Sequence, residues 1–270
     1  MVKTTCFVAV FFMQVFCLHA QELFVFSEPA SNMASKSIGL RLNNYLLKQN
    51  NNSGYAYLIA PEIMMGLSKK IMVHAEGFFS NRDSNFKFDA ASFYIKYRFY
   101  SEDDVHSHFR IAAYSKAAVS NMFIHHQAID LSGSNSGYEA GLVATKLINK
   151  VAISAGSSFV HVLDNSDVKK YYFTGRNAVL YNISLGKLLL PKEYINYNQL
   201  NVNGMIEMLG ETKLYSGNTF MDVAPSLQFI IKSRMRIDAG YRFAVIKQLQ
   251  RKNNSVFLIR LEYNIFNAYK

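Results

Sequence analysis

The sequence predicts an all-β protein, a single closed antiparallel transmembrane β-barrel of about twelve strands. Apolar and polar residues alternate with a period of two through most of the chain. The alternating segments recur near the roughly ten residues that a tilted strand needs to cross a bilayer. After residue 20, no apolar run reaches the roughly eighteen residues of a membrane helix. Because only helices and closed barrels satisfy every backbone hydrogen bond in lipid, these observations favour a barrel.

The segment 86–117 carries the alternation most clearly. Phe93 and Ile95 fall on one face of its first arm, and Lys96 falls on the other face. The polar turn 101–104 interrupts the pattern, which then resumes in a second arm. This segment predicts two long strands joined as a hairpin, with one apolar face and one charged face.

The other strands follow the same pattern along the chain. In order, the predicted strands cover 38–46, 55–67, 71–80, 86–100, 109–117, 138–145, 151–159, 179–186, 200–208, 221–229, 234–243 and 257–265. Proline cannot donate to a strand ladder, so we expect a bulge at Pro61 and a second irregularity at Pro225. Short connections mostly alternate with longer polar ones, which is typical of periplasmic turns and outside loops, with both termini in the periplasm.

Residues 1–20 form a predicted secretory signal peptide. Lys3 precedes the apolar run 6–17, and Ala20 marks the expected cleavage site. Both cysteines of the chain, Cys6 and Cys17, lie inside this segment. The mature protein is therefore expected to have no thiol, which excludes disulfides and cysteine-ligated metals.

Residues 21–36 precede the regular alternation, and residues 37–270 form the predicted barrel. Two interpretations of 21–36 stay open, a short plug and a lead-in to the first strand. A loosely ordered lead-in is the preferred expectation, because chain termini are usually poorly ordered.

Charged residues of the predicted strands fall mainly on the polar parity. An arginine or lysine at the middle of the lipid costs about 2–4 kcal/mol, so this face is expected to line the lumen. The predicted lumen-facing residues are Arg41, Glu62, His74, Glu76, Lys96, Arg98, Arg110, Lys116, Glu139, Glu207, Asp222, Arg236, Asp238, Arg242, Arg260 and Glu262. They either line a water-filled path or pair across the lumen and close it.

Basic residues of this inward set gather in two groups, which favours anionic or polar solutes. The groups are Lys96, Arg98, Arg110 and Lys116, and then Arg236, Arg242 and Arg260. The net charge of the whole chain is +10, spread along its length without a basic arm or a nucleic-acid motif. The expected partners are therefore outer-membrane lipid and a small solute, and no nucleic acid.

Two loops carry residue types that bind metals. His125 and His126 are adjacent, and Asp164, Asn165 and Asp167 form an acidic cluster. Adjacent histidines point apart in extended chain, and Asp and Asn are ordinary turn formers. We therefore expect neither a metal nor a cofactor.

Two histidines in the predicted strands are candidates for chemistry. His161, near Ser157 and Ser158, is the candidate base of an outer-membrane lipid hydrolase, but the spacing forms no recognisable nucleophile–base pair. His74 beside Glu76 is a candidate pH-sensitive pair, with a structural hydrogen bond as the preferred interpretation. We do not expect an enzyme.

The start of the barrel resembles a group of known sequences. Residues 28–33 (EPASNM) and 37–42 (SIGLRL) resemble the start of uncharacterised outer-membrane proteins from Bacteroidota-type bacteria. The strand pattern is more loosely similar to the transporter family associated with meta-pathway phenol degradation. This resemblance implies an outer-membrane channel for small compounds and supplies no functional residue. The chain departs from barrels that end on an aromatic assembly signal, since it runs on to Tyr269 and Lys270.

These observations lead to one expected function and three alternatives. We expect a channel in the bacterial outer membrane for passive uptake of small polar, anionic or aromatic solutes. A closed barrel with a structural or partner-binding role is the first alternative. A lipid-modifying enzyme and a soluble exported β protein are the others.

Overall fold

The structure is a computed structural model, and it describes residues 24–49, 54–83, 85–104, 107–124, 126–166, 169–193 and 198–269. The predicted signal peptide, residues 1–20, lies outside the described residues. Within the described residues, no helix is long and apolar enough to cross a membrane.

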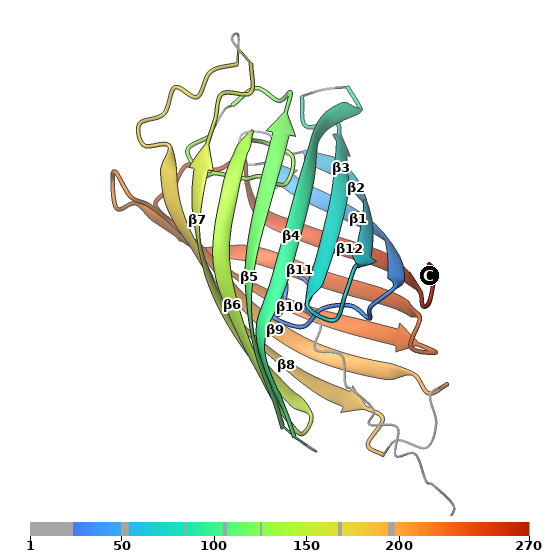
Figure 1. Ribbon diagram of the computed structural model, residues 1–270. Helices are drawn as coiled ribbons and strands as arrows, with labels where there is room; N and C mark the ends of the chain where they lie inside the picture. The colour runs from blue at the N-terminus through green and yellow to red at the C-terminus, as the bar shows by residue number, and fades with distance from the viewer. Residues whose placement is uncertain are drawn as a thin grey trace, which may run out of the picture.

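Twelve antiparallel strands close into one barrel in the described part of the chain (Figure 1). Each strand pairs with its neighbours in sequence, and β1 pairs with β12 to close the sheet. The strands are β1 (Ser37–Gln49), β2 (Tyr55–Gly66), β3 (Ile71–Ser80), β4 (Lys87–Asp103), β5 (Ser107–Ser120), β6 (Gly137–Ile148), β7 (Val151–Val162), β8 (Asn177–Leu190), β9 (Asn201–Lys213), β10 (Thr219–Ile231), β11 (Met235–Lys247) and β12 (Asn253–Ile265). The predicted all-β closed barrel is confirmed.

The observed strand ends and bulges differ in part from those predicted. β4 runs through the predicted turn to Asp103. The predicted bulge at Pro61 is wrong, because Pro61 pairs with Leu42 and the register of β2 does not shift on either side. In β10 the register shifts between Met221 and Asp222 rather than at Pro225. A proline therefore fits these ladders without an inserted residue.

Connections of two kinds lie at the two ends of the barrel. At one end most connections are short turns, as at 149–150 and 232–234, with the longer connection 191–200 between β8 and β9 as the exception. The other end carries the longer loops 121–136 and 163–176, which rise at the top of the view in Figure 1. Ser37 begins β1 opposite Gly66, so the N-terminal segment enters the barrel from the end with the short turns.

The exterior of the barrel is apolar and its interior is polar. Leu142 and Ile183, in the middle of their strands, are 55% and 56% exposed. Lys96, Glu207 and Asp238 are completely buried inside. This is the reverse of a water-soluble fold, in which apolar side chains fill the centre and ions cover the surface.

The segment before β1 lies inside the barrel (Figure 1). Phe24, Val25 and Ala30 are 3%, 1% and 0% exposed. The preferred expectation for residues 21–36, a loosely ordered lead-in, is therefore wrong for the part that begins at Phe24. The cause is tertiary contact, because the barrel wall supplies hydrogen-bonding partners that a free terminus lacks.

Candidate functional site

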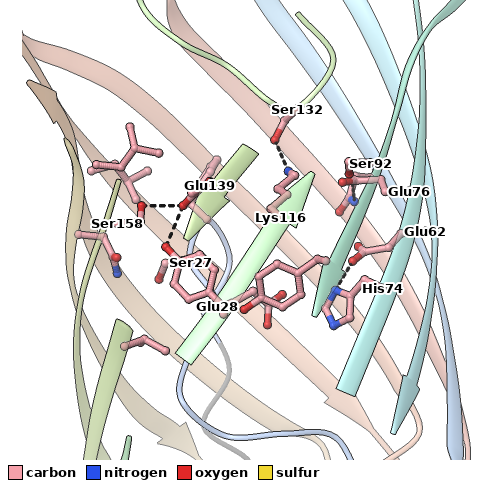
Figure 2. Close-up of a pocket in the computed structure, with 18 of the residues that line it drawn as sticks. Ser27, Glu28, Glu62, His74, Glu76, Ser92, Lys116, Ser132, Glu139 and Ser158 are labelled. Atoms are coloured by element: carbon pink, nitrogen blue, oxygen red, sulfur yellow. Dashed lines mark hydrogen bonds and ion pairs between the residues drawn. The ribbon is translucent and has the colours of Figure 1, made fainter. Parts of the chain in front are cut away.

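A polar chamber of about 350 Å³ lies inside the barrel (Figure 2). Its lining comes from the N-terminal segment, from loop 121–136 and from most of the strands. The volume lies at the small end of the range for small-molecule sites, about 300–1,000 Å³. The chamber is therefore large enough for a small solute, and its boundaries decide how that solute enters.

The N-terminal segment forms the floor of the chamber, toward the end with the short turns. Its main-chain N–H groups at Val25, Phe26 and Ser27 each donate to the carboxylate of Glu207 on β9, all at 2.9 Å. The Ser27 hydroxyl adds a fourth bond to Glu207, at 2.7 Å. Hydrogen bonds to an ionised acceptor are about twice as strong as neutral ones. Glu207 therefore clamps the segment to the wall.

Other strands hold the same segment from the opposite side of the barrel. The buried ammonium of Lys96 on β4 donates to the carbonyls of Pro29 and Ser31, at 2.6 and 2.8 Å. The N–H of Ala30 donates to the Thr145 hydroxyl on β6, at 2.9 Å. The Glu207 carboxylate thus accepts hydrogen bonds from N–H groups of the floor, and Lys96 donates hydrogen bonds to its carbonyls. Because these two residues lie on different sides of the barrel, the segment spans the lumen.

Glu28 adds an ion pair to the floor. Its carboxylate lies 3.0 Å from the guanidinium of Arg41 and 3.9 Å from the ammonium of Lys96. Burial alone would raise the pKa of Glu28, but Arg41 and Lys96 favour its charged form and lower the pKa from 4.5 to about 2. Glu28 is therefore charged at neutral pH.

Loop 121–136 folds into the mouth of the barrel and forms the roof of the chamber. Its residues Ile129 and Leu131 are 6% and 5% exposed. The N–H of Ile129 donates to both carboxylate oxygens of Glu211 on β9, at 3.1 Å. Lys213 lies 3.7 Å from Glu211 and donates to the hydroxyl of Tyr171. The roof therefore has a carboxylate clamp of its own.

A network of ion pairs fills the wall beside and below the chamber. Register places Arg41 opposite both Glu62 and Glu262, and its guanidinium lies 3.0 and 2.8 Å from their carboxylates. Arg236 lies 2.8 Å from Glu262 and 3.1 Å from Asp238. Buried charges of this kind cost desolvation and persist only when they are paired. This network is the salt-bridge filling that the sequence left open as an alternative to a channel.

Aromatic rings cover the wall formed by β3, β4 and β5. The rings of His74 and Tyr94 are 5.0 Å apart, and those of Tyr94 and Tyr114 are 5.5 Å apart. A carboxylate lies at each end of this row. Glu62 is 2.6 Å from the Nδ1 atom of His74, and Glu139 accepts a hydrogen bond from the Tyr114 hydroxyl at 2.8 Å. The chamber thus offers both ring faces and charges to a solute.

Comparisons with known proteins identify the fold. No family model matches the sequence, and no curated protein matches it either. Among solved structures, an outer membrane channel from Pseudomonas putida F1 aligns with a TM-score of 0.61 and 9% identity, over 90% of this chain and 100% of that chain. The NanC porin aligns with a TM-score of 0.52 and 9% identity, over 85% and 98% of the two chains. The KdgM porin aligns with a TM-score of 0.51 and 6% identity, over 83% and 98%. The chain therefore has the barrel fold of outer-membrane porins.

The structure places half of the predicted lumen-facing residues around the chamber. These are Arg41, Glu62, His74, Glu76, Lys116, Glu139, Arg242 and Arg260. Six others lie buried in the interior away from the chamber or within its floor clamps and ion-pair network, namely Lys96, Arg110, Glu207, Arg236, Asp238 and Glu262. Asp222 is 1% exposed and pairs with Arg242 and Arg251.

Three of the expected groupings differ in the structure. Arg98 lies at the end with the short turns, where its guanidinium donates to the Lys69 carbonyl at 2.8 Å. The expected basic group on β4 and β5 is therefore divided, with Lys96 at the floor and Lys116 directed toward the roof. His74 pairs with Glu62 on the neighbouring strand β2 rather than with Glu76. Residues two apart on one strand, such as His74 and Glu76, point in the same direction side by side and do not face each other.

The sequence did not predict that the Glu207 and Glu211 carboxylates hold the floor and the roof. Glu207 was predicted to face the lumen, but its partner Val25 lies 182 residues away and no local pattern joins them. Glu211 shares the parity of Glu207 and lay beyond the predicted end of its strand, which β9 extends to Lys213. A signal for the roof was present, because loop 121–136 carries several apolar residues, Ile129 and Leu131 among them.

The loop residues considered for metal binding have other partners. His126 bonds the Ala128 carbonyl at 2.9 Å, and burial lowers its pKa. Asp164 accepts the N–H of Tyr171 and pairs with Arg176, and these contacts lower its pKa. His125 and Asp167 lie outside the described residues. In the part of the chain that the structure describes, no three His, Cys, Asp or Glu residues gather as metal ligands.

The residues considered for lipid hydrolysis are engaged separately. His161 bonds Asn177 at 2.6 Å and stacks on Tyr138. Ser157 donates to the Leu180 carbonyl, and Ser158 donates to Glu139 inside the barrel. The hydrogen bonds of these described residues do not join a serine to His161, so the geometry offers no nucleophile–base pair.

Proposed function

We propose that this protein is a bacterial outer-membrane channel for passive uptake of small polar, anionic or aromatic solutes. The observation that carries the proposal is the chamber of about 350 Å³ inside a closed barrel with an apolar exterior. Interior charges serve no purpose against lipid, and they suit a lumen that water and solutes enter. The likeness of the fold to outer-membrane porins supports the same conclusion.

In this state the N-terminal segment and loop 121–136 each lie across part of the proposed channel. The floor lies between the chamber and the end with the short turns, and the roof lies across the mouth with the long loops. Movement of either segment therefore widens the proposed path, while the barrel wall stays in place. The Glu207 and Glu211 carboxylates each accept hydrogen bonds from main-chain N–H groups of their segment, so each is a point at which that segment can be loosened.

The proposed location is the outer membrane after cleavage of residues 1–20. Two resemblances, to Bacteroidota-type proteins and to the phenol-degradation transporter family, belong to this proposal. The likeness to the P. putida channel, with a TM-score of 0.61, is one of fold and supports an outer-membrane barrel. The exposed aliphatic side chains, such as Leu142 and Ile183, are the surface that would contact lipid.

A second function is favoured by a different observation. The ion-pair network around Arg41 and Arg236, together with the floor, fills much of the lumen on the side of the short turns. A closed barrel with a structural or partner-binding role in its outside loops has the same features. The two functions differ in whether ions ever pass.

Conductance across a planar bilayer distinguishes them. The refolded full chain and a variant lacking residues 24–31 are compared, with Glu207→Gln as a milder variant in case the deletion prevents folding. We expect rare openings in the full chain and frequent openings in both variants, since each loosens the floor. A folded barrel without openings in any of the three would establish the structural role instead.

A further inference from the structure

Lys116 on β5 and Glu139 on β6 form an open pair of opposite charges in the chamber wall. Their Cα atoms are direct partners in the β5–β6 ladder. Side chains at such positions start about 5 Å apart, within easy reach of one another. The ion pairs of the described residues nevertheless do not include one between Lys116 and Glu139, so each charge is held elsewhere.

Three hydroxyl groups keep the two charges apart. Glu139 accepts hydrogen bonds from Tyr114 and Ser158, at 2.8 and 2.7 Å. Lys116 donates to the hydroxyl of Ser132 in the roof, at 3.0 Å. Figure 2 shows Lys116 directed up to Ser132 and Glu139 turned sideways to Ser158. Both charged side chains are half-buried and line the chamber.

From this arrangement we propose that the open pair binds the head group of a small zwitterion with an apolar body, as in an α-amino acid. The inference rests on the proposed channel and names its class of solute. The ammonium of the solute binds Glu139, and its carboxylate binds Lys116. A solute with one charge gains one of these contacts and meets repulsion from the other group, so the zwitterion is favoured over both.

The rest of the chamber fits such a solute. Val143, Leu180 and Leu209, on β6, β8 and β9, provide apolar surface, and Leu180 is the ladder partner of Ser158. Most other charges of the lining are committed to partners. Arg41 pairs with Glu28 and Glu62, Glu62 also pairs with His74, Arg260 with Asp238, and Arg242 with Asp222.

Glu76 is the other chamber carboxylate without a cation in the ion pairs of the described residues. It accepts a hydrogen bond from Asn43 at 3.2 Å and lies near Ser92 in Figure 2, apart from Glu139. Glu76→Gln therefore removes a second carboxyl group from the chamber and leaves the hydrogen bonds of Lys116 and Glu139 in place, although Glu76 also interacts electrostatically with Lys116. It is the matched control for Glu139→Gln.

Equilibrium dialysis tests the inference with three probes that share one apolar phenyl group and differ in their charges. Phenylalanine is a zwitterion, 2-phenylethylamine a cation and 3-phenylpropionate an anion. The folded full chain in detergent micelles is compared with micelles alone. We expect phenylalanine to be retained about tenfold more tightly than either single-charge probe, as charge-assisted hydrogen bonds imply.

Variants assign the two ends of the solute. Glu139→Gln is expected to weaken the binding of phenylalanine and 2-phenylethylamine by about tenfold and to leave the binding of 3-phenylpropionate unchanged. Lys116→Met is expected to weaken the binding of phenylalanine and 3-phenylpropionate instead. Glu76→Gln is expected to leave the preference for phenylalanine over the single-charge probes unchanged. Equal retention of the probes, no retention, or an equal effect of Glu76→Gln would overturn the inference.

The same measurement separates this inference from the proposed channel. Retention of phenylalanine by a barrel that never conducts would rule out the proposed channel and support the proposed site. Conductance without a preference for the zwitterion would keep the channel and remove the site.

Discussion

Glu207 and Glu211 lie four residues apart on β9, and the carboxylate of each holds a segment that crosses the lumen. Glu207 binds the N–H groups of the floor, and Glu211 binds the N–H of Ile129 in the roof. Leu209 lies between them and lines the chamber. At about 3.3 Å per residue, the two clamps stand roughly 13 Å apart along the strand. One strand therefore fixes both boundaries of the chamber.

Loss of the floor clamp should open the channel. Glu207→Gln keeps the shape of the side chain and removes the charge that strengthens its bonds to Val25, Phe26 and Ser27. We expect openings in planar bilayers to become about tenfold more frequent, the factor that corresponds to roughly 1.4 kcal/mol. Ser184→Ala, which removes a hydroxyl that bonds Ser27 and Glu207 but keeps the carboxylate, should have a smaller effect. Identical opening frequencies in all three proteins would contradict the clamp.

Loss of the roof clamp should act on the other boundary alone. In Glu211→Gln the N–H of Ile129 loses the carboxyl group that it contacts through both oxygens. Hydrogen exchange followed by mass spectrometry should then show faster exchange in the peptide that contains Ile129. The peptide that contains Val25 should be unchanged, and Glu207→Gln should give the opposite result. Faster exchange in both peptides of one variant would show that floor and roof are a single unit.

A cysteine reporter tests whether Lys96 holds the floor. The natural cysteines, Cys6 and Cys17, both lie in the predicted signal peptide, so Ala30→Cys is expected to give the mature chain one thiol. Ala30 is completely buried, and a maleimide should label this position slowly. Adding Lys96→Met removes the donor to the Pro29 and Ser31 carbonyls, and labelling should become at least several-fold faster.

Lys146→Met is the control for that experiment. Lys146 lies over the ring of Phe109, 5.6 Å from its centroid. Its loss should leave labelling at position 30 unchanged. If both lysine variants accelerate labelling equally, the effect belongs to the whole barrel and not to the floor.

Acid should release the floor. The pKa of Glu28 is lowered from 4.5 to about 2, so its ion pairs stabilise the docked segment fully above about pH 4.5. This contribution is lost as the pH falls from there toward 2, because protonation removes the charge that Arg41 and Lys96 attract. Labelling of Ala30→Cys, measured with an acid-tolerant thiol reagent, should accelerate over this range. In Glu28→Gln labelling should be faster at neutral pH and the acid step should be smaller, since the Glu207 carboxylate that also holds the floor remains.

A charge on the outer surface should destabilise the barrel in lipid. Ile183 lies in the middle of β8 and is 56% exposed. Ile183→Arg should lower the free energy of unfolding by about 2–4 kcal/mol in vesicles, the cost of arginine near the middle of the lipid. Ile183→Ala controls for loss of the side chain itself. Equal stability of the two variants in urea titrations would show that this surface does not face hydrocarbon.

The sequence predicted the barrel because its wall is encoded locally. Period-two alternation assigned the twelve strands, since each strand carries its own inward and outward residues. The floor and the roof depend instead on contacts between distant residues, as between Val25 and Glu207 or Ile129 and Glu211. Alternation along a strand holds no information about which main-chain group a carboxylate will meet. The bulge predicted at Pro61 failed for a related reason, because the ladder tolerates the missing donor without a shift.

The two separate clamps on β9 have a consequence for the permeability barrier of the cell. If the floor and the roof open independently, the fraction of time in which a continuous leak exists is the product of two small fractions. A molecule can then enter from one side and leave to the other by alternate opening of the two boundaries, while a continuous path between the two compartments almost never exists.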